Sequence, residues 1–273
     1  MAIPIAGYIE NSLIEWEGNI VSIIFLPSCN LRCPYCHSPH LVQPSNKLET
    51  IPVENILEAV KRNRAWLDGI VITGGEPTLH KNLDELIESF RSLGIKVRLD
   101  SNGTNPDVLE DLIRRKLIQC VAMDIKAPLN KEKYERVAGM QDAEFAIPPH
   151  LSSPLGGEGW GEGEQCNRHS TLLSSIRRSI ELIMNSGIEY EFRTTISPAF
   201  LNESDIVEIA RTIKGAQRYV LQGFKPNNCL DNEMLNITPY PVETLKQFAK
   251  SAKAYVKNCF VRGEAKKELC RQW

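Results

Sequence analysis

The stretch NIVSIIFLPSCNLRCPYC, residues 19–36, decides how the chain is built. Its first half, residues 19–27, is short, apolar and rich in β-branched side chains, which is typical of a buried strand. Its second half is a proline-containing loop with three cysteines, Cys29, Cys33 and Cys36, in the spacing C-x3-C-x2-C. A buried strand that runs directly into clustered thiols predicts a chemical centre at the carboxyl end of that strand.

From this strand onward, short β-branched runs alternate with segments of helical periodicity. The predicted strands are residues 19–27, 69–75, 95–103, 119–126, 188–196 and 216–224. The predicted helices are residues 52–66, 83–93, 106–116, 172–185, 202–214 and 241–257. Such strand-then-helix units imply right-handed crossovers and a parallel sheet, either open and doubly wound or curled into a full or partial barrel. In both architectures the chemistry lies where the strands end.

Two segments fall outside this alternation. Residues 1–18 are expected to form a short hairpin or lead-in. Residues 147–170 have no hydrophobic period and carry five glycines between Gly156 and Gly163. We expect a flexible, disordered insertion there, within a single domain of residues 1–273. A partner-binding lid is the alternative, and Cys166 and His169 within it are weak candidates for a metal site.

The composition excludes several classes of partner. The net charge is −2, so no excess of positive charge favours nucleic acid or an anionic membrane. The N-terminal residues lack a signal-peptide pattern, and no apolar run reaches the roughly 18 residues that span a bilayer. We therefore expect a cytoplasmic protein, in which the eight cysteines stay reduced and form no disulfide framework.

The three clustered cysteines admit three interpretations. They could be ordinary buried residues, or they could bind zinc with His37 or His40 as the fourth ligand. Thiolates at this density also suit an iron–sulfur cluster. A cubic [4Fe–4S] cluster on three cysteines would keep one iron free of protein ligands, and a substrate or cofactor could bind there.

The motif Cys29-Asn-Leu-Arg-Cys33-Pro-Tyr35-Cys36 resembles the signature of the radical S-adenosylmethionine (radical SAM) enzymes. The resemblance covers nearly the whole chain except the glycine-rich segment. It implies an α/β fold, a partial (β/α)6 TIM-like barrel of parallel strands with outer helices. It also implies a [4Fe–4S] cluster on the three cysteines, which are then both metal ligands and catalytic residues. S-adenosyl-L-methionine (SAM) would bind the free iron, with Tyr35 beside it.

The second predicted strand ends in a motif that matches the family. In TGGEP, residues 73–77, Gly74, Gly75 and Glu76 correspond to the family's GGE motif. The resemblance implies that this backbone and the Glu76 carboxylate receive the ammonium group of SAM, and glycine leaves room for such close approach. Without the resemblance, these residues are an ordinary tight turn.

The next two strands end in polar residues. The resemblance places Ser101 and Asn102 near the ribose and carboxylate of SAM, although Asn-Gly is also a common turn. Asp124 and Lys126 are two residues apart and therefore point to the same side of a strand. The SAM carboxylate would give Lys126 a negative partner, and a plain Asp–Lys salt bridge is the alternative. In related glycyl-radical activating enzymes matching aspartates hold a monovalent cation, which Asp100 and Asp124 could do here.

The resemblance implies a mechanism and a class of partner. One electron, from a donor such as flavodoxin or ferredoxin, would cleave SAM into methionine and a 5′-deoxyadenosyl radical that abstracts hydrogen from a substrate. The segments CPYCHSP, DSNGT, VAMDIKAP and YEFRTTI together resemble activating proteins of glycyl-radical enzymes. The best match is the activating protein of anaerobic ribonucleoside-triphosphate reductase, and its substrate would be the Cα–H of one glycine in that partner.

Two other functions stay open. A radical SAM enzyme could instead modify a small molecule, an RNA base or a peptide, and it would turn over without a protein partner. A non-enzymatic iron–sulfur or zinc module would cleave no cofactor. The segment 147–170 is where the chain departs from the family's pattern, and it puts the docking of a partner in doubt.

Overall fold

The protein is built on one sheet of eight strands in the order β1-β2-β3-β4-β5-β6-β7-β8. The computed structural model describes residues 3–42, 48–140 and 165–262. The strands are β1 (Gly7–Ser12), β2 (Val21–Leu26), β3 (Gly69–Gly74), β4 (Lys96–Ser101), β5 (Cys120–Asp124), β6 (Glu189–Ile196), β7 (Tyr219–Gly223) and β8 (Cys259–Val261). β1 pairs with β2 in antiparallel fashion, and each later pair is parallel. Because the strand order never reverses, as it would in a doubly wound sheet, the fold is the expected partial barrel.

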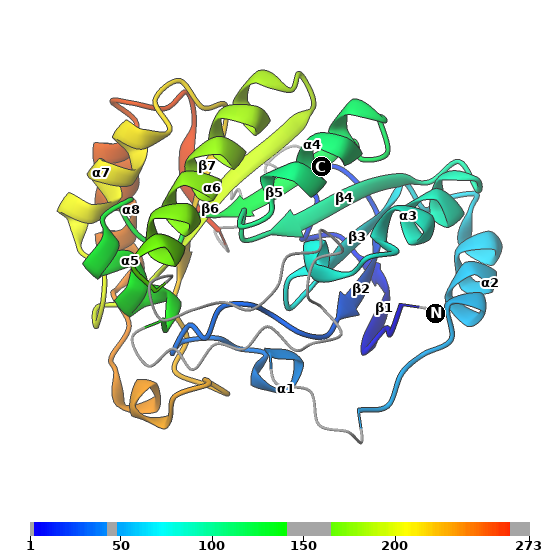
Figure 1. Cartoon of the computed structure of the whole chain (residues 1–273), viewed down its shortest axis with the longest axis horizontal. Helices are drawn as coiled ribbons and strands as arrows, with labels where there is room; N and C mark the ends of the chain where they lie inside the picture. Colours follow the sequence, from blue (N-terminus) through cyan, green and yellow to red (C-terminus); the bar gives the residue numbers. More distant parts are fainter. Residues whose placement is uncertain (1–2, 43–47, 141–164, 263–273) are drawn as a thin grey trace, which may run out of the picture.

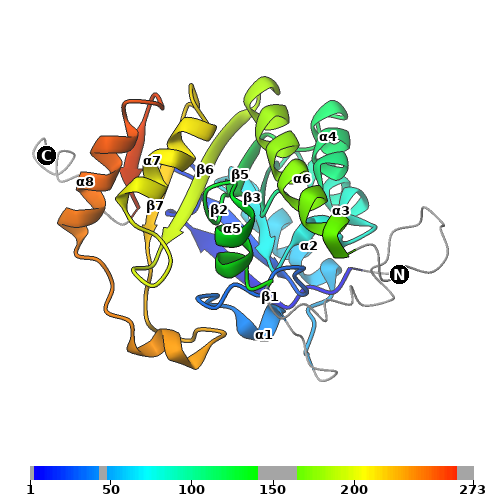
Figure 2. The ribbon, with the colours of Figure 1, turned by 60° about the vertical axis from the view of Figure 1, so that its left-hand side comes forward.

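Most of the helices cover the outer side of the curved sheet, as Figures 1 and 2 show from two directions. The helices are α1 (Pro39–Val42), α2 (Val53–Asn63), α3 (Leu83–Arg91), α4 (Pro106–Arg114), α5 (Lys131–Ala138), α6 (Gln165–Asn185), α7 (Glu203–Thr212) and α8 (Val242–Ala252). Two short 3-10 segments, η1 (Pro77–Leu79) and η4 (Asn232–Asn236), lie in loops. None of the helices in the described part of the chain combines the length and apolar character that crossing a bilayer requires.

The predicted alternation is confirmed, with four differences, the first being the short helix α1 at Pro39–Val42, which was not predicted. The short strand β8 adds a further parallel strand beyond the six predicted. Helix α5 was not predicted, because its sequence is polar and buries only Tyr134, Val137 and Ala138. Helix α6 begins at Gln165, so the last six residues of the segment expected to be disordered are helical. The rest of that segment, residues 147–164, lies outside the described residues, as do the side chains of Cys166 and His169.

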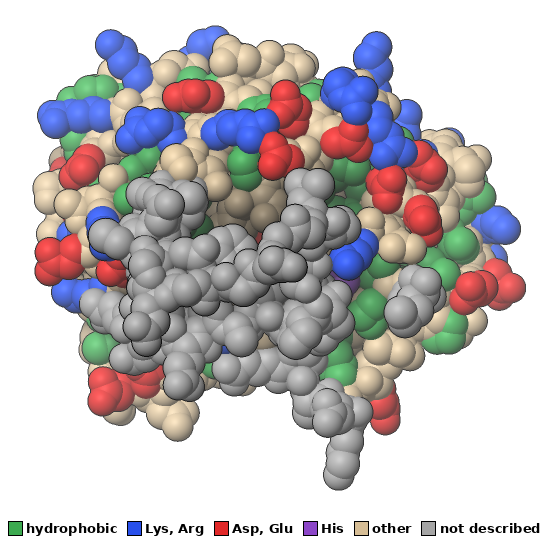
Figure 3. Space-filling view, in the orientation of Figure 1, with side chains coloured by type: hydrophobic (Ala, Val, Ile, Leu, Met, Phe, Trp, Pro, Cys, Tyr) green, Lys and Arg blue, Asp and Glu red, His purple; other side chains and the backbone are tan. Residues whose placement is uncertain are grey.

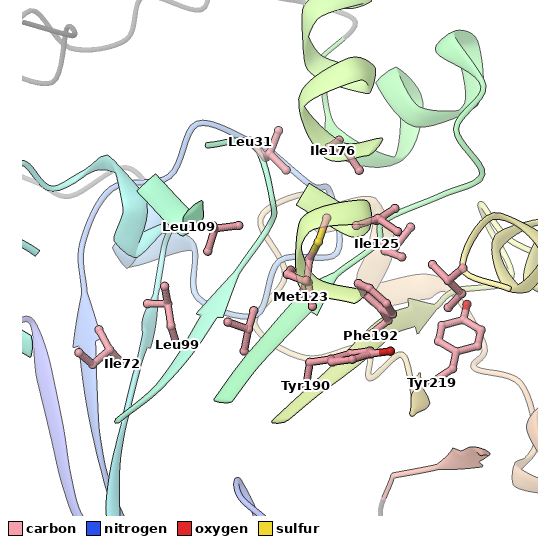
Figure 4. Packing of buried hydrophobic residues seen from close by; sticks show 14 of the residues in the cluster. Leu31, Ile72, Leu99, Leu109, Met123, Ile125, Ile176, Tyr190, Phe192 and Tyr219 are labelled. Carbon is pink, nitrogen blue, oxygen red and sulfur yellow. The ribbon is translucent and has the colours of Figure 1, made fainter. Parts of the chain in front are cut away.

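The outer face of the sheet is apolar and forms the main core beneath the helices. Strand residues alternate between the two faces, and the outer positions carry large apolar side chains. Figure 4 shows this cluster, which includes Ile72, Leu99, Met123 and Phe192 of the sheet with Leu109 of α4 and Ile176 of α6. Burying each such side chain contributes roughly 1.5–3 kcal/mol, so this face supplies much of the driving force for folding.

The inner face of the barrel is mixed. Near the amino ends of the strands, Trp16 packs against Val21, Ile23 and Val71 in a separate small cluster. The Trp16 indole N–H donates to a carboxylate oxygen of Glu189 at 3.1 Å. Because the loop before β2 fills this end of the barrel, the opposite end, where the strands terminate, is left for a site.

A local capping signal explains where α7 begins. The predicted cap Asn202 accepts a hydrogen bond from the Asp205 backbone N–H, and the Asp205 carboxylate accepts one from the Asn202 N–H. This reciprocal capping box starts α7.

Over the face displayed in Figure 3, Lys and Arg side chains are interspersed with Asp and Glu, which agrees with the net charge of −2.

Candidate active site

The carboxyl ends of β2 to β6 open into a pocket of about 790 Å³, a volume that includes its open mouth. The pocket gathers eleven of the twelve residues predicted for the site: Cys29, Cys33, Tyr35, Cys36, Gly74, Gly75, Asp100, Ser101, Asn102, Asp124 and Lys126. Glu76 is the exception. Among the other lining residues are Arg193, His37 and Thr195. Segments separated by more than 160 residues therefore meet at one edge of the sheet, as the parallel fold predicts.

The loop that carries the cysteines begins in a strained conformation that its neighbours hold in place. Ser28 has φ 71, in the left-handed region that few residues other than glycine adopt. Its N–H donates to the Leu41 carbonyl at 2.6 Å. One residue earlier, the Pro27 carbonyl accepts a hydrogen bond from the buried His80 ring at 2.8 Å. These contacts fix the direction in which the chain leaves β2.

Helix α5 supports the middle of the cysteine loop. The Arg32 N–H donates to the Ala138 carbonyl at 2.9 Å. Gly139, the left-handed residue that ends α5, has φ 68, and a Cβ there would lie 1.9 Å from the Arg32 carbonyl oxygen. Only glycine therefore satisfies both the turn and the close approach of the loop.

Asn102 connects the cysteine loop to the end of β4. Its side-chain N–H group donates to Asn30 Oδ1 at 2.8 Å, and Asn30 in turn donates to Thr104 Oγ1 at 2.9 Å. The Asn102 Nδ2 atom also lies 4.0 Å from Cys29 Sγ. Asn102, which the resemblance places near the ribose and carboxylate of SAM, thus also orders the loop that carries the first cysteine.

Cys29 and Cys33 lie in an environment that keeps their thiols protonated until a metal binds. Burial raises the pKa of Cys29 to about 12 and that of Cys33 to about 11. Iron binding must therefore displace protons, and the bond to the metal has to outweigh this cost. No three His, Cys, Asp or Glu side chains of residues 3–42, 48–140 and 172–262 are gathered closely enough to bind a single ion.

The zinc interpretation with a histidine as fourth ligand gains no support from His37. Its Nε2 atom is hydrogen-bonded to the Lys225 carbonyl at 2.9 Å, and its ring stacks on Phe224 with 6.1 Å between centroids. Three cysteines in one loop provide one thiolate for each of three irons of a [4Fe–4S] cluster, as the resemblance implies.

Gly74 and Gly75 are needed first for a contact within the chain. A Cβ at Gly74 would lie 2.2 Å from the Leu26 carbonyl oxygen, and a Cβ at Gly75 would lie 1.9 Å from the Ser28 carbonyl oxygen. The Gly75 N–H donates to Leu26 at 2.8 Å, which binds the ends of β2 and β3 together. The resemblance assigns these glycines to the approach of SAM, and the structure adds that the cysteine loop itself requires them.

Glu76 is completely buried and does not line the pocket. Its carboxylate accepts hydrogen bonds from the Thr78 N–H at 3.1 Å and the Thr78 hydroxyl at 2.5 Å, the Ser101 hydroxyl at 2.9 Å and the Asn102 N–H at 2.6 Å. Burial nevertheless raises its pKa above the usual value. In this geometry the carboxylate joins the ends of β3 and β4, and its expected role as a direct partner of the SAM ammonium group stays a prediction.

A row of charged side chains forms one wall of the pocket and continues into the barrel. The register of β5 and β6 places Asp124 opposite Arg193. Arg193 contacts Asp124 at 2.7 Å and Asp100 at 2.8 Å. The second oxygen of Asp124 accepts from Lys126 at 2.9 Å, and the second oxygen of Asp100 accepts from Arg98 at 2.9 Å. The row Lys126, Asp124, Arg193, Asp100, Arg98 alternates in sign.

Mutual pairing keeps these groups ionised despite their burial. Burial would raise the pKa of Asp124, but Arg193 and Lys126 outweigh it and lower the pKa. Burial would likewise lower the pKa of Lys126, but Asp124 and Cys33 hold it well above its usual value. The expected monovalent cation on Asp100 and Asp124 stays a prediction, and it would have to compete with the Arg193 guanidinium that already bridges the two carboxylates.

Tyr35 places a hydroxyl group with no hydrogen-bond partner among the described residues at this site. The side chain is 5% exposed and lines the pocket, and burial holds its pKa well above the usual value. Leaving a buried hydroxyl unsatisfied costs roughly 1–3 kcal/mol, so such groups usually have a partner. An unsatisfied hydroxyl beside thiols, cations and carboxylates fits a pocket that receives a polar ligand as well as an iron–sulfur cluster.

Several functional candidates were missed at the level of sequence. For Arg193 the sequence did contain a signal. Arg193 and Glu191 are two residues apart in one strand, so both charged side chains point to the same face of the sheet. His80 and α5 gave no such signal, since their importance depends on contacts with Pro27 and Arg32 far away in the chain.

Comparison with known proteins agrees with this geometry. Residues 23–147 match the family model described as the Radical SAM superfamily. A protein of Methanocaldococcus jannaschii, provisionally named a glycyl-radical enzyme activating enzyme, is 32% identical over 260 residues, which cover 94% of this chain and 95% of that protein. A pyruvate formate-lyase-activating enzyme of Listeria monocytogenes is 30% identical over 132 residues, 44% of this chain and 52% of that enzyme.

The fold is shared with solved structures of low sequence identity. The crystal structure of Streptococcus suis SuiB bound to S-adenosylmethionine superposes with a TM-score of 0.60 at 13% identity. The alignment covers 88% of this chain but 52% of SuiB, so the chain spans about half of that protein. At this identity the likeness concerns the fold alone.

Proposed function

We propose that this chain generates a glycyl radical in a partner enzyme. The chain belongs to the radical SAM superfamily and within it to the glycyl-radical enzyme activating enzymes. Cys29, Cys33 and Cys36 would hold a [4Fe–4S] cluster, and SAM would bind beside it. The observation that carries the proposal is that the three thiols, the charged wall and the unsatisfied Tyr35 hydroxyl share one pocket.

The bound cluster and SAM supply the radical chemistry. Held by Cys29, Cys33 and Cys36, the cluster would pass one electron from a donor to SAM, which would supply methionine and a 5′-deoxyadenosyl radical able to take a hydrogen atom from a glycine Cα–H, with 5′-deoxyadenosine and a glycyl radical as the products. The polypeptide binds, orients and shields these groups, since the cofactor carries out the difficult step.

The charged groups of the pocket suit different parts of SAM. The ammonium group of Lys126 and the guanidinium group of Arg193 can face a carboxylate, while Asp100 and Asp124 can face an ammonium group or ribose hydroxyls. The Tyr35 hydroxyl can donate to an acceptor atom of the ligand. Because the charged groups are held by each other at 2.7–2.9 Å, they are oriented before the ligand arrives.

The identity of the partner is a finer part of the proposal. The motifs at the strand ends resemble the activating protein of anaerobic ribonucleoside-triphosphate reductase, and we propose that enzyme as the partner, with flavodoxin or ferredoxin as electron donor. The Listeria relative is named for a different glycyl-radical enzyme, pyruvate formate-lyase, which is therefore the second candidate. A small molecule, RNA base or peptide as substrate would use the same pocket without a protein partner.

Two measurements on anaerobically reconstituted protein test the proposal. Chemically reduced protein with SAM should form 5′-deoxyadenosine, and protein with an intact cluster that forms none would overturn the proposed activity. Addition of a candidate glycyl-radical enzyme should then produce the doublet of a glycyl radical in the electron paramagnetic resonance (EPR) spectrum. Formation of 5′-deoxyadenosine without a doublet in either candidate partner would favour another substrate.

A further inference from the structure

The carboxyl end of the cysteine loop is held by a segment that comes much later in the chain. Residues 225–231, called the clasp below, follow β7 and run alongside this end of the loop. The Leu230 N–H donates to the Cys36 carbonyl at 3.0 Å, and the Asp231 N–H donates to the Pro34 carbonyl at 2.9 Å. The clasp is therefore hydrogen-bonded to the backbone of the third predicted iron ligand itself.

The clasp also holds His37, the residue that follows Cys36. The Asn228 side-chain N–H group donates to the His37 carbonyl at 3.0 Å. The His37 Nε2 atom lies 2.9 Å from the Lys225 carbonyl oxygen, and because a carbonyl only accepts, this ring nitrogen is the donor. Hydrogen bonds to the clasp thus fix the backbone on both sides of the Cys36 side chain.

The shape of the clasp is set by contacts of its own. Asn228 has φ 50, in the left-handed region that asparagine tolerates better than most residues do. The buried Cys229 side chain lies beneath the turn, with its Sγ atom 3.7 Å from two carbonyl oxygens of the clasp. At the far end, the Asp231 carboxylate accepts from the Glu233 N–H at 2.8 Å and so begins η4. The clasp can therefore act as a fixed support for the loop.

The first two cysteines are supported by other parts of the fold. Cys29 lies where the loop leaves β2, and the Arg32 N–H, next to Cys33, donates to the Ala138 carbonyl at the end of α5 at 2.9 Å. Within the loop, the Cys36 N–H donates to the Cys33 carbonyl at 2.9 Å. The clasp thus gives the third cysteine a support that is separate from that of the first two.

We propose that the clasp positions Cys36 for the cluster and that Asn228 is a positioning residue within it, an inference that rests on the proposed function. A [4Fe–4S] cluster on three cysteines is held by one thiolate at each of three irons, so displacement of Cys36 weakens one of the three bonds to the protein. Asn228 is not among the residues that line the pocket. It acts on the cluster through the backbone of His37 and makes no contact with SAM.

The test uses full-length protein, reconstituted anaerobically and without SAM. Asn228→Asp keeps the size of the side chain and its tolerance of the left-handed conformation, but it replaces the N–H donor by a carboxylate oxygen that faces the His37 carbonyl. Loss of iron to an excess of EDTA should be about five-fold faster, roughly the effect of one lost hydrogen bond. The EPR spectrum of the reduced cluster should also change shape, because one ligand is displaced.

Asn227→Asp is the matched control. Asn227 and Asn228 are neighbours and both are exposed, so the two variants make the same change of charge in the same surroundings. The contact of Asn227 within the clasp is made by its backbone N–H, which donates to the Lys225 carbonyl at 2.9 Å and is retained in the variant. Asn227→Asp should therefore lose iron at the wild-type rate and give the wild-type spectrum.

The EPR spectrum decides the outcome, since a contact that only stabilises the fold would leave the spectrum of the intact cluster unchanged. A wild-type spectrum in Asn228→Asp overturns the inference, whatever the rate of iron loss, and leaves the proposed function intact. An equal change in Asn227→Asp also overturns it, because charge alone would then be the cause. If Asn228→Asp assembles no cluster, Asn228→Gly decides, since glycine keeps the left-handed backbone and removes only the amide, and a wild-type spectrum there overturns the inference. Wild-type protein that assembles no four-iron cluster overturns the proposed function and the role of the clasp with it.

Discussion

At the scale of the residue, three thiols and one hydroxyl define what the pocket can bind. Cys33 is 7% exposed and Tyr35 is 5% exposed, yet both line the pocket, so each is reached only by a group that enters it. Both side chains belong to the main apolar core, and the Tyr35 ring packs against Phe200, but these contacts do not account for the hydroxyl or the thiol. The Tyr35 hydroxyl has no partner among the described residues, and burial keeps the thiol of Cys33 protonated while no metal is bound.

Replacement of Cys33 by alanine should abolish both cluster assembly and cleavage of SAM, because one of three protein ligands is lost. Iron and sulfide analysis, the EPR spectrum and a 5′-deoxyadenosine assay measure these effects. Cys166→Ala is the control and should leave the iron content unchanged, since Cys166 lies outside the motif. A Cys33→Ala protein with four irons and wild-type cleavage would disprove the assignment of the ligands.

Tyr35→Phe should act in opposite directions on the free protein and on the complex with SAM. Without ligand, the variant should be more stable by about 1 kcal/mol, because a buried hydroxyl without a partner is removed. Binding of SAM should weaken about five- to ten-fold, because the ligand loses one hydrogen bond. Thermal unfolding and calorimetric titration check the two effects. Unchanged affinity would show that the hydroxyl does not meet the ligand.

At the scale of the element, the cysteine loop has little regular structure and depends on what surrounds it. The ends of β2 and β3 approach so closely that Gly74 and Gly75 have no room for a side chain. The end of α5 approaches Arg32 just as closely at Gly139. The position of the thiols is therefore set by the packing of two neighbouring elements against the loop.

Gly139→Ala should separate α5 from the cysteine loop. The new Cβ would lie 1.9 Å from the Arg32 carbonyl oxygen, so the loop must move, and we expect reduced iron incorporation together with lower stability. Gly187→Ala is the matched control, because Gly187 has φ 75 and no atom within 4 Å of an added Cβ. It should cost about 1 kcal/mol through backbone strain and retain the cluster. Equal iron content in the two variants would show that this contact does not position the thiols.

At the scale of the whole molecule, ion pairs join strands across the interior of the barrel. Arg98 contacts Asp100 at 2.9 Å and Glu191 at 2.9 Å, and Glu191 also contacts Arg262 at 2.5 Å, next to β8. Together with Lys126, Asp124 and Arg193, these groups connect the pocket to the far edge of the sheet. Such buried charges are stable only as a set, because removing one leaves another without its counter-charge.

The stability of the protein should therefore fall in acid. Arg193 and Arg98 lower the pKa of Asp100, so the folded state binds fewer protons than the unfolded state. The stabilisation is complete above the unfolded pKa of about 3.9 and is lost as the pH falls below it. Glu76 acts in the opposite direction, because its pKa is raised and protonation favours its folded form. The net decline below about pH 4 is measurable by urea unfolding between pH 7 and pH 3.

Asp100→Asn tests the source of this decline. At pH 7 the variant should be less stable by about 3 kcal/mol, because Arg98 and Arg193 both lose a buried partner. Its stability should then depend less on pH in the acid range. Asp111→Asn is the control, since Asp111 pairs with Arg115 on the exposed surface and should change stability little. An acid decline as steep in Asp100→Asn as in the wild type would contradict the role of the interior ion pairs.

Much of the architecture and of the site could be predicted because the signals are local. The β-branched runs at residues 19–27 and 69–75 predict strands by themselves, and parallel strands place their carboxyl ends together whatever their exact register. Glu76 and Asn102 show the limit of this reasoning. Both were correctly placed at strand ends. The hydrogen bond between them, however, joins segments that are 26 residues apart. No local pattern shows whether a side chain at a strand end will face the pocket or the protein interior.

The sequence by itself determined the order of strands and helices, the thiol spacing and the family, because period, composition and motif spacing are properties of neighbouring residues. Only the tertiary structure decided that Arg193 bridges Asp100 and Asp124, that α5 supports the cysteine loop, and that Tyr35 has no partner among the described residues. These features depend on register and close packing between residues as far apart as Arg32 and Ala138, and the energy of such contacts appears only when the chain has folded.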